Sequence, residues 1–272
     1  MSSSHLMQVD SECLKAVQFI ATDMDGTLTQ RGLFTAELIH TLEHLARVEI
    51  SVLIVTGRSA GWVSGLVHYL PVVGAIAENG GIFFPGHATP GKTEPGKTEP
   101  DNWLVPVANL ATHRQQLAHI FAELKQKFPQ LQESTDNRYR LTDWTFDVQG
   151  LTLSDLEQLS QHCQHRGWSI TYSTVQVHIK LPQQTKAAGL LTVLAQSFPH
   201  LTPHQIVTVG DSPNDESLFD AAQFPFSVGV ANLQDYRDRL LHHPTCITTA
   251  AEGAGFCELA QQLIRHKVPV QA

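Results

Sequence analysis

Three features are missing from the sequence, and each absence argues against a class of protein. No run of eighteen apolar residues occurs, which argues against a membrane-spanning helix. Residues 1–16 are too polar for the apolar part of a signal peptide, so we expect a cytoplasmic protein with a disordered or tag-like start. Acidic residues outnumber lysine and arginine, and the resulting net charge of −8 argues against general binding to nucleic acid or to a membrane surface.

Metal-binding and disulfide patterns are also lacking. No Cys-x-x-Cys occurs, and the wide spacing of the four cysteines is typical of reduced thiols rather than of a disulfide framework: Cys13, Cys163, Cys246 and Cys257. Among fifteen histidines, His162 and His165 stand three apart on one predicted helix. No further ligand is suggested near them, so this pair is interpreted as part of a solvated helix face.

The most informative stretch is Asp23-Met24-Asp25-Gly26-Thr27-Leu28, which directly follows the apolar run 17–21. It places two carboxylates at the carboxyl end of a predicted buried strand, where open α/β sheets bind their ligands. Asp and Gly are also residues that turns recruit, so this stretch alone could be an ordinary helix-capping turn. Two charges at the end of a buried strand therefore need partners from elsewhere in the chain.

Three further stretches offer such partners. The predicted strand 51–55 ends in Thr56-Gly57-Arg58, Lys186 opens a predicted helix, and the predicted strand 206–209 runs into residues 210–215, Gly-Asp-Ser-Pro-Asn-Asp. Each also has an ordinary interpretation: the first stretch could be a strand-to-helix turn, the lysine could be solvated, and residues 210–215 could be a helix N-cap with acidic residues. Their joint occurrence, in this order and after buried strands, favours a functional site.

Together these stretches resemble the four signature motifs of the haloacid dehalogenase superfamily, whose members are mostly phosphatases. The arrangement is most similar to the Cof-type branch with a C2 cap. The motifs cover both ends of the chain, while the middle hundred or so residues match in length and placement more than in sequence. The resemblance implies a Rossmann-like three-layer α/β/α core with a parallel sheet and an inserted α+β cap domain.

The motif residues suit phosphoryl transfer, which needs positioning and charge neutralisation more than covalent chemistry. Asp23 is predicted to be the nucleophile that forms an aspartyl phosphate. Asp25 faces the same side of an extended segment and would protonate the leaving oxygen, then deprotonate the attacking water. Thr56 offers a hydroxyl and a backbone N–H to the phosphoryl oxygens, and Lys186 offers a positive charge that keeps the nucleophile ionised.

A Mg²⁺ site is predicted because this cation prefers carboxylate oxygens and water. Asp23 and Asp211 are its natural ligands; the resemblance adds the Asp25 carbonyl, and Asp215 would support the site directly or through water. The same resemblance implies phosphate or substrate contacts from a further set of residues: Thr27, Gly57, Arg58, Asn79 and Asn214.

The chain of 272 residues, 42% of them hydrophobic, suits one large domain or two smaller ones. Only one helix, 35–47, fits between the first two motifs, so no lid domain is expected there. The longer stretch before Lys186 must supply core elements near 59–70, 74–77 and 81–84, and the remainder has the size of a small domain. The expected division is a catalytic core formed by 17–84 and 183–272, with an α+β cap at 85–182.

The predicted cap begins with a Pro/Gly-rich segment, 89–100, that contains Gly-Lys-Thr-Glu-Pro twice. No strand or upstream glycine precedes it at the spacing of a Walker loop, so a solvent-exposed loop is expected. Helix 109–128, strand-like residues 138–148 and a helix with a capping box at 154–157 follow, and strands are expected at 168–172 and 175–181.

Substrate selection should reside where this cap meets the core. The segment Glu78-Asn79-Gly80-Gly81 at a core strand end resembles a stretch that borders the active site in Cof-type proteins, although its two glycines could equally form a tight turn. Basic residues of the cap are further candidates, although charged strand residues more often face water: Arg138, Arg140, His178 and Lys180.

We therefore expect a Mg²⁺-dependent phosphatase of small phosphorylated metabolites, most typically a sugar phosphate or a related polyol or acid phosphate. Its partner would be a small phosphoester, and the protein would be a monomer or a homodimer. Two alternatives stay open. A phosphomutase would return the phosphoryl group to a sugar before water arrives, and a non-catalytic binding or regulatory protein could share the same fold.

Overall fold

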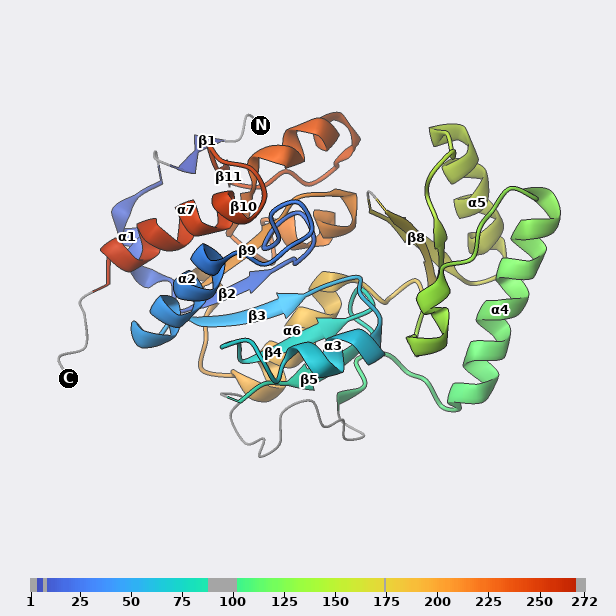
Figure 1. Ribbon diagram of the computed structural model, residues 1–272, viewed down its shortest axis with the longest axis horizontal. Helices are drawn as coiled ribbons and strands as arrows, with labels where there is room; N and C mark the ends of the chain where they lie inside the picture. Colours follow the sequence, from blue (N-terminus) through green and yellow to red (C-terminus); the bar gives the residue numbers. More distant parts are fainter. Residues whose placement is uncertain (1–3, 7–8, 88–101, 174, 268–272) are drawn as a thin grey trace.

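The computed structural model describes residues 4–6, 9–87, 102–173 and 175–267. Two separate sheets organise these residues, as Figure 1 shows. One is eight-stranded, with the order β1-β11-β10-β9-β2-β3-β4-β5, and the other is three-stranded, with the order β6-β8-β7. The predicted fold class is confirmed: an α/β core with a mostly parallel sheet is joined to a smaller α+β unit.

The strands of the large sheet pair in parallel except β4 with β5, which are antiparallel. Most are fully buried, as expected for strands covered on both faces. Their bounds are β1 (Ser4–His5), β2 (Phe19–Thr22), β3 (Ser51–Val55), β4 (Gly74–Ala77), β5 (Ile82–Pro85), β9 (Ile206–Gly210), β10 (Phe226–Gly229) and β11 (Cys246–Ile247).

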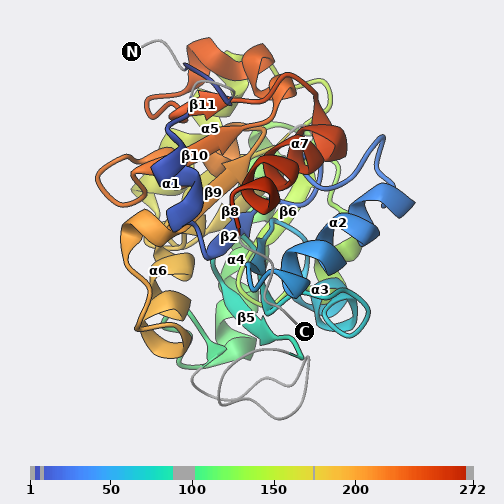
Figure 2. The ribbon, with the colours of Figure 1, turned by 90° about the vertical axis from the view of Figure 1, so that its left-hand side faces the viewer.

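Helices cover both faces of this sheet. One face packs on α1 (Ser11–Ala16), α2 (Ala36–Arg47), α3 (Ala60–Leu66) and α7 (Glu252–Arg265), and the other on α6 (Lys186–Ser197). Figure 2 shows α6 on one side of the strands and α2 and α7 on the other. The buried apolar residues form one cluster on each face of the sheet. Side chains alternate between the two faces along β2, so Ile20 belongs to the first cluster and Phe19 and Ala21 to the second.

Parallel pairing in register brings three of the predicted motifs to one edge of the sheet. Thr22, the last residue of β2, pairs with Ile54 of β3 and with Val209 of β9. The residues that follow these strands therefore leave the sheet side by side, at the edge where α/β proteins bind ligands.

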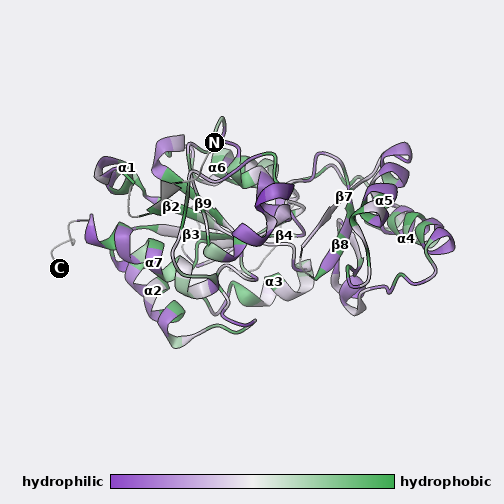
Figure 3. Ribbon diagram, turned by 90° about the horizontal axis from the view of Figure 1, so that it is seen from above, coloured by the Kyte–Doolittle hydropathy of each residue, from purple (hydrophilic) through white to green (hydrophobic). Residues whose placement is uncertain are grey.

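The small sheet forms a unit of its own, with α4 (Leu110–Lys127), β6 (Trp144–Asp147), α5 (Leu153–His165), β7 (Ser169–Tyr172) and β8 (Gln176–Lys180). Both helices pack on one face of this antiparallel sheet through an apolar cluster that includes Leu117, Leu159 and Phe146. Figure 3 shows α4 and α5 on the side of the small sheet away from the large one. The other face of the small sheet is therefore turned towards the core. The exact domain boundaries expected from the sequence stay a prediction.

Several local expectations differ from the structure. Residues 1–16 are not disordered where they are described, since β1 pairs with β11 and α1 buries Leu14 against the core. In the cap, residues 135–139 form the 3-10 helix η3 (Thr135–Tyr139), so the strand expected from residue 138 begins only at β6. The capping box of α5 uses Thr152 and Asp155 rather than Ser154 and Glu157.

The segments after β9 and β10 are 3-10 helices: η5 (Pro213–Phe219) and η6 (Ala231–Arg239). A further short one, η4 (Pro203–Gln205), precedes β9. The repeat segment 89–100 lies outside the described residues, so its expected loop structure stays a prediction. Within the described ranges, no helix has the length and apolarity needed to cross a bilayer.

The packing of α1 generates a stability prediction. Leu14 is buried against the core, so Leu14→Ala should lower the free energy of unfolding by about 2–5 kcal/mol. Lys15→Ala is the matched control, because Lys15 lies on the same helix with a half-exposed side chain, and it should change stability by less than about 0.5 kcal/mol. Urea denaturation followed by circular dichroism measures both. Equal, small effects would contradict the assignment of α1 to the folded core.

Candidate active site

Three aspartates meet where β2 and β9 leave the sheet. Asp23 follows β2, and its N–H donates to the Val209 carbonyl at 2.9 Å, while Asp211 follows β9. Asp215 lies on η5 and turns back, so that oxygen atoms of Asp23, Asp211 and Asp215 lie within 4.8 Å of one another. All three residues are buried, and like charges at this separation need a cation.

Lys186 supplies one positive charge to this cluster. It is the first residue of α6, its side chain is fully buried, and Nζ donates to Asp23 Oδ1 at 2.5 Å and to Asp215 Oδ1 at 2.6 Å. The second carboxylate oxygen of Asp215 accepts the backbone N–H groups of Asp211 and Ser212, at 2.9 and 3.2 Å. Asp215 therefore orients both the lysine and the loop that carries Asp211.

The electrostatics of the cluster favour a bound cation. Burial raises the pKa of Asp23 to about 7; Lys186 opposes this rise, and the carboxylates of Asp215 and Asp25 add to it. Burial, followed by the charges of Asp23 and Asp215, raises the pKa of Asp211 well above its usual range. Three buried carboxylates face a single ammonium, and their ligand atoms are all oxygen. The residues present therefore fit a hard metal ion.

Asp25, the second carboxylate of the first motif, is paired differently. Arg58 holds it with two hydrogen bonds, Nη2 to Oδ1 at 2.7 Å and Nε to Oδ2 at 2.8 Å. Both side chains are partly exposed, at 47% for Arg58 and 36% for Asp25. The guanidinium is thus engaged by a carboxylate of the site rather than free for another anion.

A backbone hydrogen bond to β4 holds the start of the loop that follows β3. The N–H of Thr56, which the sequence suggests for phosphate binding, instead donates to the Ile76 carbonyl at 2.9 Å, and this part of the prediction is wrong. The Thr56 hydroxyl accepts the Arg58 N–H at 3.1 Å and still has its own proton to donate. Gly57 is needed for close packing, since a Cβ there would lie 3.2 Å from both Asn79 Nδ2 and His178 Cε1.

A cavity of about 70 Å³ lies over these groups, between core and cap. The core lines it with Asp23, Asp25, Thr56, Gly57, Arg58, Ser212 and Asn214, and the cap with Ser173, Val175, Gln176 and His178. Two predicted contacts lie outside this lining. Thr27 donates to Asp211 Oδ1 at 3.4 Å, and Asn79 is buried behind Gly57, where Oδ1 accepts Asn214 Nδ2 at 3.4 Å and Nδ2 has no partner.

Some site residues have no signature in the sequence. Asn232 on η6 donates to Asp211 Oδ2 at 2.9 Å and to the Gly26 carbonyl at 3.1 Å, so it ties two motif loops together. Its position just after a parallel strand, β10, was the available signal. Ser173 and Gln176 of the cap carried no such signal.

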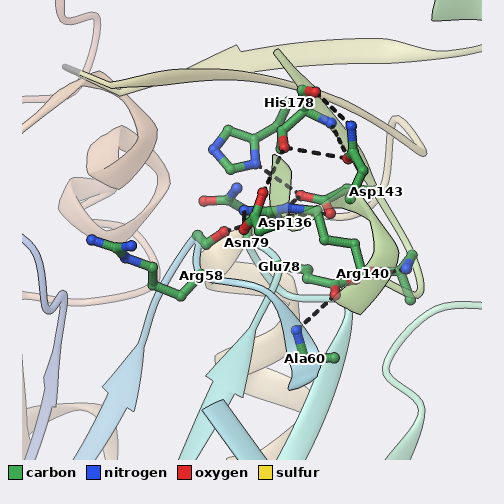
Figure 4. A network of polar contacts seen from close by, with 12 residues as sticks. Arg58, Ala60, Glu78, Asn79, Asp136, Arg140, Asp143 and His178 are labelled. Atoms are coloured by element: carbon green, nitrogen blue, oxygen red, sulfur yellow. Dashed lines mark hydrogen bonds and ion pairs between the residues drawn. The ribbon is translucent and has the colours of Figure 1, made fainter. Parts of the chain in front are cut away.

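Core and cap are joined by a hydrogen-bond network centred on Glu78, drawn in Figure 4. This fully buried carboxylate accepts the N–H of Ala60 at 2.8 Å, the N–H of Leu141 at 3.0 Å, and both the N–H and the hydroxyl of Thr142, at 2.6 and 2.7 Å. Burial and the charge of Asp143 raise the pKa of Glu78, against the effect of Arg140 and these bonds.

The basic residues of the cap are mostly not solvated, contrary to the simplest expectation. Arg140 is buried and donates to the Gly57 carbonyl at 3.0 Å, to both oxygens of Asp143 at 3.0 Å and to Asp136 at 2.9 Å. His178 and Lys180 are buried as well, so of the four candidates named from the sequence only Arg138 is exposed, with its guanidinium over the Tyr139 ring.

The remaining histidine and cysteine expectations have mixed outcomes. His165 is exposed as expected, but His162 is only 13% exposed and contacts Glu123 and Lys127, so the solvated interpretation of His162 is wrong. All four cysteines are free thiols, as predicted.

Comparison with known proteins agrees with this geometry. Residues 20–93 match the family model described as haloacid dehalogenase-like hydrolase, and residues 93–257, more than half of the chain, match the one described as sucrose-6F-phosphate phosphohydrolase. The phosphoglycolate phosphatase of Methanothrix thermoacetophila is 24% identical over 91% of this chain and 97% of its own. Phosphoglycolate phosphatase 1 of Saccharolobus solfataricus is 26% identical, over 92% and 96%.

Solved structures share the fold. The sucrose-phosphatase of Synechocystis sp. PCC6803, in complex with sucrose and phosphate, has a TM-score of 0.66 and 16% identity, covering 91% of this chain and 98% of its own. A Thermoplasma acidophilum protein has a TM-score of 0.69 and 19% identity over the same shares. The chain therefore belongs to the haloacid dehalogenase-like hydrolases, in the family whose model is described as sucrose-6F-phosphate phosphohydrolase. It is a phosphoric monoester hydrolase.

Lys180 generates a pH prediction. Its Nζ donates to the Gln184 carbonyl at 2.5 Å, and burial lowers its pKa to about 8, against an opposing effect of Asp143. Between pH 8 and the ordinary lysine value of 10.5, the folded protein binds fewer protons than the unfolded chain, so this residue makes stability rise with pH. The slope is at most about 1.4 kcal/mol per pH unit.

Lys180→Met should remove that contribution. The free energy of unfolding of the wild type minus that of the variant should increase between pH 8 and 10, when both are measured by urea denaturation. Lys125→Met on α4 is the exposed control, and its difference curve should stay flat. A flat curve for Lys180→Met would show that this ammonium keeps an ordinary pKa in the folded protein.

Proposed function

We propose that this protein is a Mg²⁺-dependent phosphatase that hydrolyses small phosphorylated metabolites, sugar phosphates or related phosphoesters, through an aspartyl phosphate on Asp23. The observation that carries the proposal is the buried cluster of Asp23, Asp211 and Asp215 around Lys186, at the floor of the cavity between core and cap. The names of the relatives support small phosphoesters as the substrate class.

Mg²⁺ would be held by carboxylate oxygens of Asp23 and Asp211 and by the carbonyl of Asp25, with Asp215 supporting Asp211 through its backbone. When bound, it supplies positive charge next to the transferred phosphoryl group.

The chain's own groups account for the two chemical steps. Asp23 attacks phosphorus as the carboxylate, a form that Lys186 favours and a bound cation would favour further, and the bond from phosphorus to the leaving oxygen breaks as the aspartyl bond forms. Arg58 orients the Asp25 carboxylate at the cavity wall, and Asp25 must release one oxygen from this pair and take up a proton before it gives that proton to the leaving oxygen. In the second step Asp25 accepts a proton from the attacking water, and phosphate leaves Asp23.

The size of the cavity supports a small substrate. The cavity, of about 70 Å³, is closed by the core on one side and by Ser173, Val175, Gln176 and His178 of the cap on the other. A leaving group too large for this space would require the cap to move. Such gating would also exclude water during the first step.

Asp23→Asn should lower kcat for phosphate release by at least about 10³-fold, because an amide cannot act as the nucleophile. The assay uses p-nitrophenyl phosphate, sugar phosphates and phosphoglycerates with Mg²⁺, with and without EDTA. Asp238→Asn is the control, since Asp238 is an exposed carboxylate on η6. Full activity in Asp23→Asn would overturn the mechanism, and no turnover by folded, Mg²⁺-loaded wild type would favour the mutase or the non-catalytic alternative.

Asp211→Asn tests the metal site without an activity assay. Mg²⁺ binding should raise Tm of the wild type by mass action, and the variant should need at least about tenfold more Mg²⁺ for the same rise. Without metal, the variant should be the more stable protein, because one of the repelling carboxylates is gone. A variant with a lower metal-free Tm and an unchanged Mg²⁺ response would contradict this site. Asp238→Asn again serves as the control.

A further inference from the structure

One strand of the cap presents polar side chains to the catalytic core. Along β8, Val177 and Ile179 are fully buried in the apolar cluster of the cap. Alternation therefore turns Gln176, His178 and Lys180 to the opposite face, towards the core. Of these, Gln176 and His178 reach the cavity over Asp23.

Asp143, on the side of the His178 ring away from the cavity, sets the orientation and the tautomer of His178. Figure 4 shows the ring of His178 joined to Asp143 by a polar contact. Nδ1 lies 2.8 Å from Asp143 Oδ2, and Asp143 also accepts two hydrogen bonds from Arg140 at 3.0 Å. Burial raises the pKa of Asp143, but Arg140 and His178 outweigh it and hold that pKa below its ordinary value. An ionised Asp143 is only an acceptor, so Nδ1 of His178 must carry a proton.

The second nitrogen of His178 is then a hydrogen-bond acceptor. The negative charge of Asp143 is already balanced by Arg140, and Lys180 adds a positive charge nearby, so little remains to hold a second proton on the ring. Burial lowers the pKa of His178 in the same direction, against the effect of Asp143. Nε2 has no hydrogen-bond partner among the described residues, and its ring lines the cavity.

The remaining cap wall is uncharged. Ser173, Val175 and Gln176 contribute a hydroxyl, an alkyl group and an amide. Among the described residues that line the cavity, Arg58 carries the only cationic side chain, and Asp25 engages it with two hydrogen bonds. A carboxylate on the leaving group would meet the lone pair of Nε2 and no unengaged cation, whereas a hydroxyl could donate to Nε2.

We propose that His178 Nε2 accepts a hydrogen bond from a hydroxyl close to the phosphoester oxygen, so that the site selects phosphorylated polyols over phosphoesters with a carboxylate at that position. This inference rests on the proposed phosphatase function and narrows its substrate class. Asp143 and Arg140 act as positioning residues for His178. His178 lines the same cavity as Asp23 and Asp25, so the recognised hydroxyl lies on the part of the leaving group nearest the phosphoester.

Three substrates with nearly the same skeleton test the proposal: 2-hydroxyethyl phosphate, ethyl phosphate and phosphoglycolate. In the wild type with Mg²⁺, kcat/KM for 2-hydroxyethyl phosphate should exceed that for each of the others by about tenfold or more. His178→Leu should bring both ratios close to one. His178→Gln, whose amide can accept a hydrogen bond, should restore part of the preference over ethyl phosphate. His165→Leu, an exposed cap control, should keep the wild-type ratios.

Ratios on one protein sample do not depend on the folded fraction, so a partly unfolded variant still gives an answer. Imidazole nitrogen NMR of the wild type adds an independent measurement, and a protonated Nε2 at neutral pH would overturn the proposal. A wild-type preference for phosphoglycolate, or wild-type ratios in His178→Leu, would do the same while p-nitrophenyl phosphate turnover leaves the phosphatase function intact. No turnover of any compound, p-nitrophenyl phosphate included, would overturn both.

Discussion

The ion pair of Lys186 with Asp23 and Asp215 is the constraint on which the rest of the site depends. Burying a carboxylate without a partner costs several kcal/mol, and this cluster buries three of them. A lysine at the start of α6 provides the one fixed positive charge and ties the sheet edge to a helix that arrives more than 160 residues after Asp23. The remaining negative charge makes the site receptive to a metal and, through it, to phosphate.

Buried charge pairs also position residues at the boundary between core and cap. The core supplies the proposed reacting groups, which depend on short connections from parallel strands. The cap supplies Gln176 and His178, whose placement depends on a second buried charge network around Asp143 and Arg140. Relatives whose names give different substrates are similar to this chain, so the fold alone does not fix the substrate.

The predictable part of this protein is the part with local signals. Asp23 and Asp211 each follow a short buried strand, so their meeting at one sheet edge follows from parallel pairing. The role of Glu78 could not be predicted from local signals, because its donors on Thr142 lie 64 residues further along the chain. Arg140 and Lys180 resemble solvated strand residues until Asp143 and the Gln184 carbonyl are placed beside them. The segments after β9 and β10 form only 3-10 helices, and η5 begins with Pro213, Asn214 and Asp215, which are weak α-helix formers.

The Glu78 network has a consequence for how such caps can be exchanged between proteins. Glu78 and Asn79 both have a positive φ of 54°, a backbone conformation that is uncommon outside glycine, and Glu78 depends on donors from the cap. A chimera that received a foreign cap without matching donors at positions 141 and 142 would leave the Glu78 carboxylate inside the joint with only the Ala60 N–H as a donor, next to the loop that carries Thr56. Core and cap therefore have a compatibility requirement at a residue that touches no substrate, and it restricts which natural recombinations of the two parts yield a folded enzyme.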